Sequence, residues 1–193
     1  YKVLCTTNFN DSTIMDGGEY FDASLYTGTG SSQAVTGFDF SPDWIWLKDR
    51  TDANSHNIHD TIRGTNNAIF SNANNAETSG SPNPYLSSFD STGFTIGGNP
   101  DVNTSSNSYV AWCWDAASST VTNNTDGSIT PSGVRANTTS GFSIVTYRGT
   151  GSNATVGHGM NAVPKMYWIK RYSHTENWIV YHESMGQGGH IKL

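Results

Sequence analysis

The sequence repeats itself, and this duplication restricts the possible folds more than any other feature. The segment Tyr-Thr-Gly-Thr-Gly-Ser beginning at Tyr26 returns as Tyr-Arg-Gly-Thr-Gly-Ser at Tyr147. After one inserted residue, Trp-Ile-Trp-Leu-Lys (44–48) corresponds to Met-Tyr-Trp-Ile-Lys (166–170). Glycine, proline and tryptophan carry most of the identities: Gly37 with Gly159, Pro42 with Pro164, Trp46 with Trp168 and Gly64 with Gly186. Such self-similarity predicts two copies of one structural unit.

The repeated unit is predicted to consist of β-strands. The segment 91–97 alternates between polar and apolar residues after a turn, and 109–114 reads as a strand with apolar residues on both faces. Helical periodicity is absent, apart from a possible turn near 68–76. Six tryptophans give an otherwise polar chain enough large side chains to form a core. We therefore expect an all-β protein.

The domain organisation follows from the repeat. We predict an N-terminal connecting segment (1–20), a first β-sandwich repeat (21–116), a linker rich in Ser, Thr and Asn (117–139), and a second, truncated repeat (140–193). The second copy lacks a counterpart of 93–114. Its face with Trp168, Trp178 and Tyr181 is therefore expected to be covered by missing sequence or, less favoured, by another subunit.

Charge and composition exclude several classes of protein. A net charge of −6 without any cluster of Lys or Arg argues against a nucleic-acid partner. No segment approaches the roughly 20 apolar residues that a membrane-spanning helix needs. Cys5 and Cys113 could form one bridge, but two buried free thiols are favoured. We expect no cofactor.

The order of motifs resembles a known family of repeats. Tyr-x-Gly-Thr-Gly (26–30) precedes Pro-Asp (42–43) and an apolar strand ending in Lys48, and His-x-x-His-Asp-x-x-Arg-Gly (56–64) follows. Gly-Phe-Thr-Ile-Gly (93–97) and Tyr-Val-Ala-Trp-Cys-Trp (109–114) complete the pattern. This order is similar to repeats in tail-fibre and other virion structural proteins of marine bacteriophages, and to the wider concanavalin-A-like lectin/glucanase jelly roll. The resemblance covers about 4–186, and 146–170 is its most specific part.

The resemblance implies an antiparallel two-sheet β-sandwich of jelly-roll type in a virion protein. The expected function is a non-enzymatic structural or adhesive module of a bacteriophage particle. Its expected partners are other virion proteins, further copies of the chain in a homo-oligomer such as a trimer, and carbohydrate on the host surface. A stand-alone lectin-like domain is the alternative. A glucanase is disfavoured, because Glu19, Glu77, Glu176 and Glu183 do not form the paired-carboxylate pattern of such enzymes.

Two clusters are weak candidates for ligand binding. Asp49, Asp52 and Asn54 could supply oxygen ligands for calcium, although Asx-rich turns explain them equally well. His56 and His59 could bind a metal or serve acid–base chemistry. On a strand these two histidines would point to opposite faces.

The competing interpretation of the histidine segment is an Asp60–Arg63 ion pair at a polar strand edge, and we favour it. The tryptophans Trp44, Trp46, Trp112 and Trp114 invite a sugar-stacking role, but core packing is the more common one.

Overall fold

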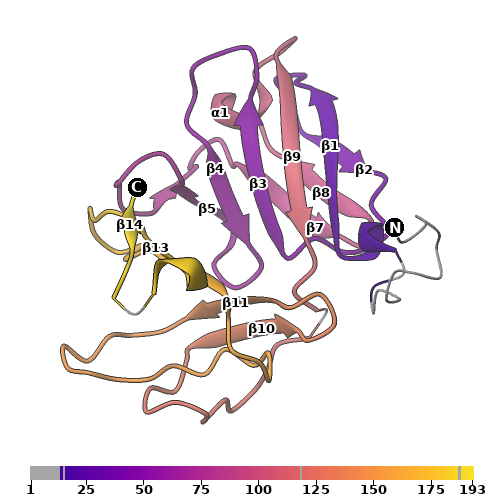
Figure 1. Ribbon diagram of the computed structural model, residues 1–193. Helices are drawn as coiled ribbons and strands as arrows, with labels where there is room; N and C mark the ends of the chain where they lie inside the picture. Colours follow the sequence, from indigo (N-terminus) through magenta and orange to yellow (C-terminus); the bar gives the residue numbers. More distant parts are fainter. Residues whose placement is uncertain (1–13, 15, 118, 187) are drawn as a thin grey trace, which may run out of the picture.

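The computed structural model describes residues 14, 16–117, 119–186 and 188–193, and it confirms the predicted all-β class (Figure 1). Residues 21–116 form a sandwich of two antiparallel sheets, which we call the first sandwich. Its larger sheet has the order β1-β9-β3-β4-β5-β6, and its smaller sheet has the order β2-β8-β7. The strands of the larger sheet are β1 (Phe21–Thr27), β3 (Trp44–Asp49), β4 (Asn57–Asp60), β5 (Gly64–Phe70), β6 (Thr78–Ser79) and β9 (Ser108–Trp114). Those of the smaller sheet are β2 (Gln33–Thr36), β7 (Leu86–Asp90) and β8 (Gly93–Ile96).

Alternation along the strands fills the core between the two sheets. In β3, Ile45 and Leu47 are fully buried, while Trp44 and Trp46 lie on the opposite face. Phe94 and Ile96 of β8 meet Ile45 and Leu47 from the smaller sheet within one hydrophobic cluster. The two-residue period of a strand therefore assigns each side chain to its face.

Within the described residues, the helical segments between the strands are short. The turns η2 (Gly17–Glu19) and η3 (Glu183–Met185) are 3-10 helices, and α1 (Pro100–Asn103) is a single α-helical turn. Helix α1 begins at Pro100 because the side chain of Asn99 caps the amide of Asp101. None of the helices in the described part of the chain has the length and apolarity to span a bilayer.

The C-terminal half, residues 119–193, contains two further sheets. The hairpin of β10 (Gly133–Asn137) and β11 (Phe142–Thr146) forms one, and β12 (Met166–Ile169), β13 (Ile179–His182) and β14 (Ile191–Lys192) form the other. Residues 117–139, expected to be a linker, thus include strand β10. Val134 of β10 is buried and gives this polar segment an apolar anchor.

Strand pairing in the C-terminal half has the same register as in the first sandwich. Trp44 pairs with Asp60 and Leu47 with Asn57, while at the matching positions Met166 pairs with His182 and Ile169 with Ile179. The next strand repeats the match, since Ile58 pairs with Ile69 and Val180 with Ile191. The two segments related by sequence therefore fold into the same three-strand unit.

Turns outside the strands also correspond. Thr29 and Thr150 each donate a side-chain hydroxyl to the carbonyl of the serine two residues later. Gly30 and Gly151, which follow these threonines, adopt φ values of 74° and 79°, a left-handed conformation that favours glycine. The shared motif Gly-Thr-Gly-Ser is therefore a turn in both places.

Candidate functional site

The predicted calcium ligands do come together, but the carboxylate oxygens of Asp49 and one oxygen of Asp52 already accept hydrogen bonds from the protein. Asp49 Oδ1 accepts from the amides of Thr51 (2.8 Å) and Asp52 (3.0 Å). Its Oδ2 accepts from the side-chain amides of Asn54 (3.0 Å) and Asn107 (2.9 Å). Asn107 also donates to Asp52 Oδ2 at 2.8 Å. The cluster is an Asx-type turn fastened to β9 by Asn107, which the sequence did not single out.

The electrostatics of Asp49 agree with this structural role. Burial alone would raise the pKa of the carboxyl, but hydrogen bonds from Asp52, Asn107 and Thr51 outweigh it and lower the pKa. The carboxylate is therefore charged and saturated by N–H donors. Among the described residues, no group of three or more His, Cys, Asp or Glu side chains is arranged to hold a metal ion.

The two candidate histidines lie on opposite sides of the larger sheet. The His56 ring contacts Trp46, whose indole donates to His56 Nδ1 at 3.0 Å. His59 is fully buried on the core side, with its ring 5.3 Å from that of Tyr85. The structure therefore does not bring the two rings together as ligands of one metal.

His59 is a neutral residue of the interior. Its Nδ1 lies 3.0 Å from the carbonyl of Asn67, and it must carry the proton because a carbonyl only accepts. Nε2 has no hydrogen-bond partner within the described structure. Burial, together with the nearby charge of Arg63, lowers the pKa of His59 to about 3.

The predicted Asp60–Arg63 pair is confirmed, and it belongs to a larger buried network. Arg63 Nε lies 2.5 Å from Asp60 Oδ2, and both side chains are almost entirely buried. Arg63 also binds Glu77 through Nη1 at 2.9 Å and the carbonyl of Ile58 through Nη2 at 3.1 Å. Three nitrogens of the guanidinium group thus tie β4 to the segment before β6. Glu77 lies far along the chain, so spacing could not identify it.

The tryptophan face, formed by Trp44, Trp46, Trp112 and Trp114, is the outer surface of the larger sheet. The C-terminal half packs on it: Phe142 approaches Trp44 and Trp114, with ring centroids 6.2 and 6.0 Å apart. Trp168 approaches Trp46 at 5.6 Å. The four tryptophans are therefore half-buried parts of an internal interface, as the core-packing interpretation expects.

Trp178 anchors this interface. It is 2% exposed, packs with Ile58 and Ile69, and donates its indole N–H to the carbonyl of Phe70 at 2.7 Å. The prediction that missing sequence or another subunit covers Trp168 and Trp178 is therefore wrong, because the first sandwich of the same chain covers them. Tyr181 does not share their side of the sheet, because its position in β13 alternates with those of Trp178 and Val180.

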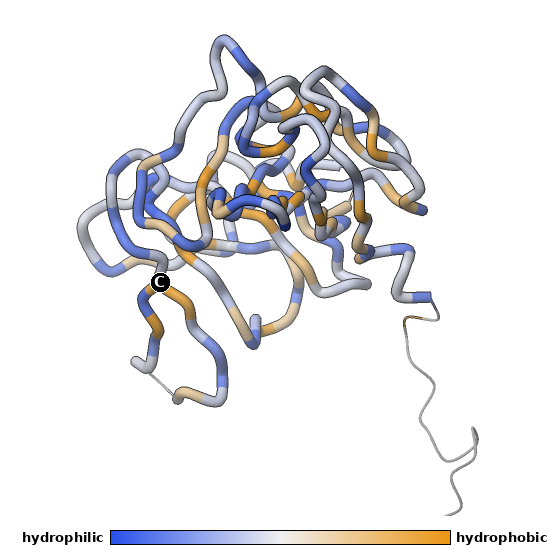
Figure 2. Tube along the Cα trace, turned by 90° about the horizontal axis from the view of Figure 1, so that it is seen from above, coloured by the Kyte–Doolittle hydropathy of each residue, from blue (hydrophilic) through white to orange (hydrophobic). Residues whose placement is uncertain are grey.

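The opposite side of the β12–β13–β14 sheet, the apolar C-terminal face, carries Tyr167, Ile169, Ile179 and Tyr181. Tyr167 and Ile169 are 41% and 39% exposed, and Tyr167 stacks on Tyr181 with ring centroids 4.7 Å apart. Figure 2 shows hydrophobic segments beside the C-terminus. In the first sandwich the matching residues Ile45 and Leu47 are fully buried.

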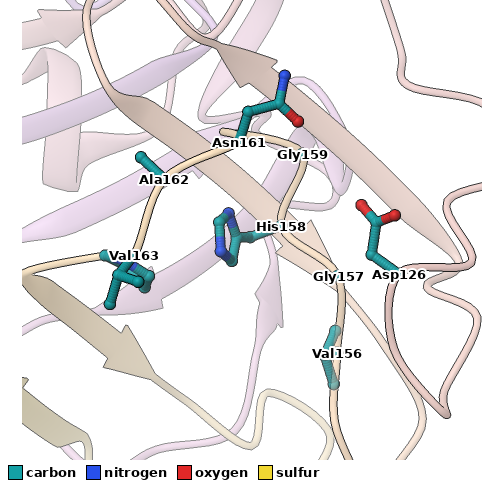
Figure 3. A pocket seen from close by; sticks show the side chains of 9 residues that line it. Asp126, Val156, Gly157, His158, Gly159, Asn161, Ala162 and Val163 are labelled. Atoms are coloured by element: carbon teal, nitrogen blue, oxygen red, sulfur yellow. The ribbon is translucent and has the colours of Figure 1, made fainter.

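An open pocket lies nearby, lined by Asp126 and by the segment 156–164 (Figure 3). In the sequence repeat this segment matches residues 35–42, where Phe38 and Phe40 are buried in the first core. Its own His158 Nδ1 accepts from the amide of Met160, and Val163 is 89% exposed. The pocket is therefore the uncovered counterpart of a surface that is interior in the first sandwich.

These observations define an all-β protein with antiparallel sheets, whose β12–β13–β14 sheet exposes apolar side chains on one side. Residues 16–193 match the family described as Domain of unknown function (DUF7483), and the chain belongs to this family. No curated protein and no solved structure matches the chain.

Proposed function

We propose that the chain is a structural module of a bacteriophage virion, located in a tail fibre or a similar appendage, and that it acts by assembly rather than by catalysis. The observation that carries the proposal is the repeated strand register of β3–β4–β5 and β12–β13–β14. We take this register, with the sequence identities, as the mark of a tandem repeat. The family resemblance of the motifs supports the virion location.

Contact between the first sandwich and the C-terminal half suits an appendage that bears mechanical load. Repeats that bury a shared interface form stiff arrays, whereas repeats on a free linker do not. Here Arg135 of the C-terminal half binds Asp43 of the first sandwich, and Trp178 closes the interface at its other side. Further copies of the chain and other virion proteins are the proposed partners.

Three of the four glutamates have structural roles that support a non-enzymatic function. Glu77 binds Arg63, Glu176 lies 3.7 Å from Arg171, and Glu183 lies 3.1 Å from Lys165. A retaining glucanase needs two carboxyl groups roughly 5 Å apart on either side of a bound sugar. Each of these three glutamates has its own basic partner, and we take this as support for a non-enzymatic function.

Contact with host glycans stays a prediction. Each tryptophan of the tryptophan face contacts another aromatic ring, so a sugar would need other aromatic residues: Trp44 and Trp114 contact Phe142, and Trp46 contacts Trp112 and Trp168. A glycan array probed with the whole chain tests this part of the proposal.

The main experiment locates the protein in the particle. An antibody raised against the chain should label purified phage particles at an appendage in electron micrographs, and the chain should appear in mass spectra of those particles. Light scattering of the isolated chain tests the homo-oligomer. Antibody labelling of infected cells without labelling of the particles would contradict the proposal.

A further inference from the structure

The C-terminal half has a vacant strand position. In the first sandwich β9 lies between β1 and β3 and pairs with both. Strand β12 takes the place of β3, as the shared register shows. Strand β11 takes the place of β1, because the match of Tyr147 to Tyr26 aligns Phe142, the first residue of β11, with Phe21, the first residue of β1. In the described residues β11 pairs only with β10 and β12 only with β13. None of the described residues provides the neighbour that β9 provides in the first sandwich.

The direction of the backbone hydrogen bonds shows that β10 does not fill this position. The amide of Val121 donates to the carbonyl of Val134, so the polar groups of Val134 point away from β11. Its partner Val145 therefore directs its own N–H and C=O away from β10. Ser24 of β1 is the residue that matches Val145. The amide of Asp115 donates to the carbonyl of Tyr20, and the amide of Gly28 donates to the carbonyl of Asn107. The even-numbered residues of β1, Ser24 among them, therefore direct their N–H and C=O groups toward β9. The free edge of β11 is thus the edge that β9 occupies in the first sandwich.

The same reasoning applies to β12. The amide of Arg50 donates to the carbonyl of Ser108, so the even-numbered residues of β3 direct their backbone N–H and C=O groups toward β9. The carbonyls of Asp43 and Lys165 both accept from the following strand, from Thr61 and Glu183 respectively. The N–H of Trp168 therefore points to the vacant position.

We propose that an extended strand of a partner polypeptide binds antiparallel between β11 and β12, with the side-chain pattern of β9. In β9 the row Val110, Trp112 and Trp114 faces outward, and the row Tyr109, Ala111 and Cys113 faces the core. The partner strand carries large aromatic residues on one face and mainly small apolar residues on the other. Main-chain bonds to two free edges provide the affinity, and the alternation provides the specificity.

The vacant position continues an interface that already exists. Phe142 of β11 contacts Trp44 and Trp114, and Trp168 of β12 contacts Trp46. A strand added between β11 and β12 extends this aromatic layer over the tryptophan face. Its opposite row lies beside Tyr167 and Ile169, the counterparts of Ile45 and Leu47, which flank Cys113 and Ala111 in the first sandwich. This inference goes beyond the proposed function and does not depend on it.

The test uses the whole chain and a synthetic peptide of residues 107–115 with Cys113→Ser. Amide hydrogen exchange is measured residue by residue with and without the peptide. Exchange at Val145 and Trp168, whose amides face the vacant position, should slow by at least about tenfold. Exchange at Ile144 and Ile169, whose amides face β10 and β13, should change little, and these residues are the internal controls.

Two substitutions, one in the peptide and one in the protein, test the proposal further. A peptide with the additional substitution Ala111→Pro should not slow exchange, because proline removes a ladder hydrogen bond. The protein variant Val145→Pro should lose binding, and the exchange data on the natural chain decide the matter if that variant fails to fold. Binding without protection of Val145 and Trp168, or no binding at about 1 mM peptide, would overturn the proposal. Protection that appears without peptide and grows with protein concentration would assign the position to a second copy of the chain instead.

Discussion

Arg135 on β10 places its Nη1 3.0 Å from Oδ1 of Asp43, so a residue of the C-terminal half neutralises a carboxylate buried in the first sandwich. Asp43 also accepts bonds from the Thr61 hydroxyl and the Ala116 amide. Burial raises the pKa of Asp43, while those bonds and the Arg135 charge act against the rise. The ion pair therefore couples the folding of the two halves.

Replacing Arg135 with leucine should lower the free energy of unfolding by about 2–3 kcal/mol, because it leaves a buried carboxylate without its counter-charge. The charge of Arg135 lowers the pKa of Asp43, so without it the folded variant takes up a proton at this carboxyl more readily than the folded natural protein does. The difference in the free energy of unfolding between the variant and the natural protein should therefore shrink as the pH falls. Urea denaturation at several pH values measures both effects.

The control for this variant is Lys165→Leu, which removes the exposed pair between Lys165 and Glu183. It should change stability by at most about 1 kcal/mol, since solvent screens exposed ion pairs. Equal losses for Arg135→Leu and Lys165→Leu would contradict the coupling role of the buried pair.

His59 should make the protein less stable in acid. Its folded pKa of about 3 lies below the ordinary value of 6.5, so the unfolded state binds a proton that the folded state excludes. Stability from this residue is complete above the unfolded pKa and falls by roughly 3 kcal/mol between about pH 6.5 and 4. The variant His59→Asn keeps a donor for the Asn67 carbonyl and should lose this pH dependence relative to the natural chain.

Exposed His174 supplies the control for the acid experiment. The variant His174→Asn should follow the natural chain across the whole pH range. Thermal denaturation monitored by circular dichroism compares the three proteins. If the stability of His59→Asn falls with decreasing pH as steeply as that of the natural chain, acid destabilisation has another origin.

Trp178 should matter more than any exposed aromatic of the C-terminal half. Trp178→Ala is expected to cost about 3–5 kcal/mol through the cavity it leaves. Trp178→Phe should cost less, because it loses the hydrogen bond to Phe70 but keeps most of the packing. Tyr172, 38% exposed, offers the matched control Tyr172→Ala. Denaturant titration measures all three, and comparable losses for Trp178→Ala and Tyr172→Ala would argue against the packed interface.

Calcium should not stabilise the Asp49 turn. Four N–H donors already bind the Asp49 carboxylate, so the melting temperature should be the same with a chelator and with about 5 mM calcium. Asp49→Ala should still destabilise the fold by about 2–4 kcal/mol, because those donors lose their acceptor. A calcium-dependent rise in melting temperature that Asp49→Asn abolishes would restore the calcium hypothesis.

Local patterns in the sequence predicted several strands and the division of their side chains between two faces. The alternation placed Trp44 and Trp46 on one face of a strand and Ile45 and Leu47 on the other, and the structure shows that the second pair lies in the core of the first sandwich. The three-residue spacing of Asp60 and Arg63 predicted their ion pair. Such features depend on the period of the backbone and on contacts between near neighbours, and a sequence displays both directly.

Only the tertiary structure decided what covers the tryptophan face and where the long-range partners lie. Asn107 binding Asp49, Glu77 binding Arg63 and Arg135 binding Asp43 join residues from different segments. Strand β10 arose in a polar segment because β11 lay beside it with a free edge. The path of the chain selects these partners, and many paths are compatible with the same local pattern. The sequence therefore determined the local alternation of the strands, and the packing of the C-terminal half on the first sandwich determined which faces are covered.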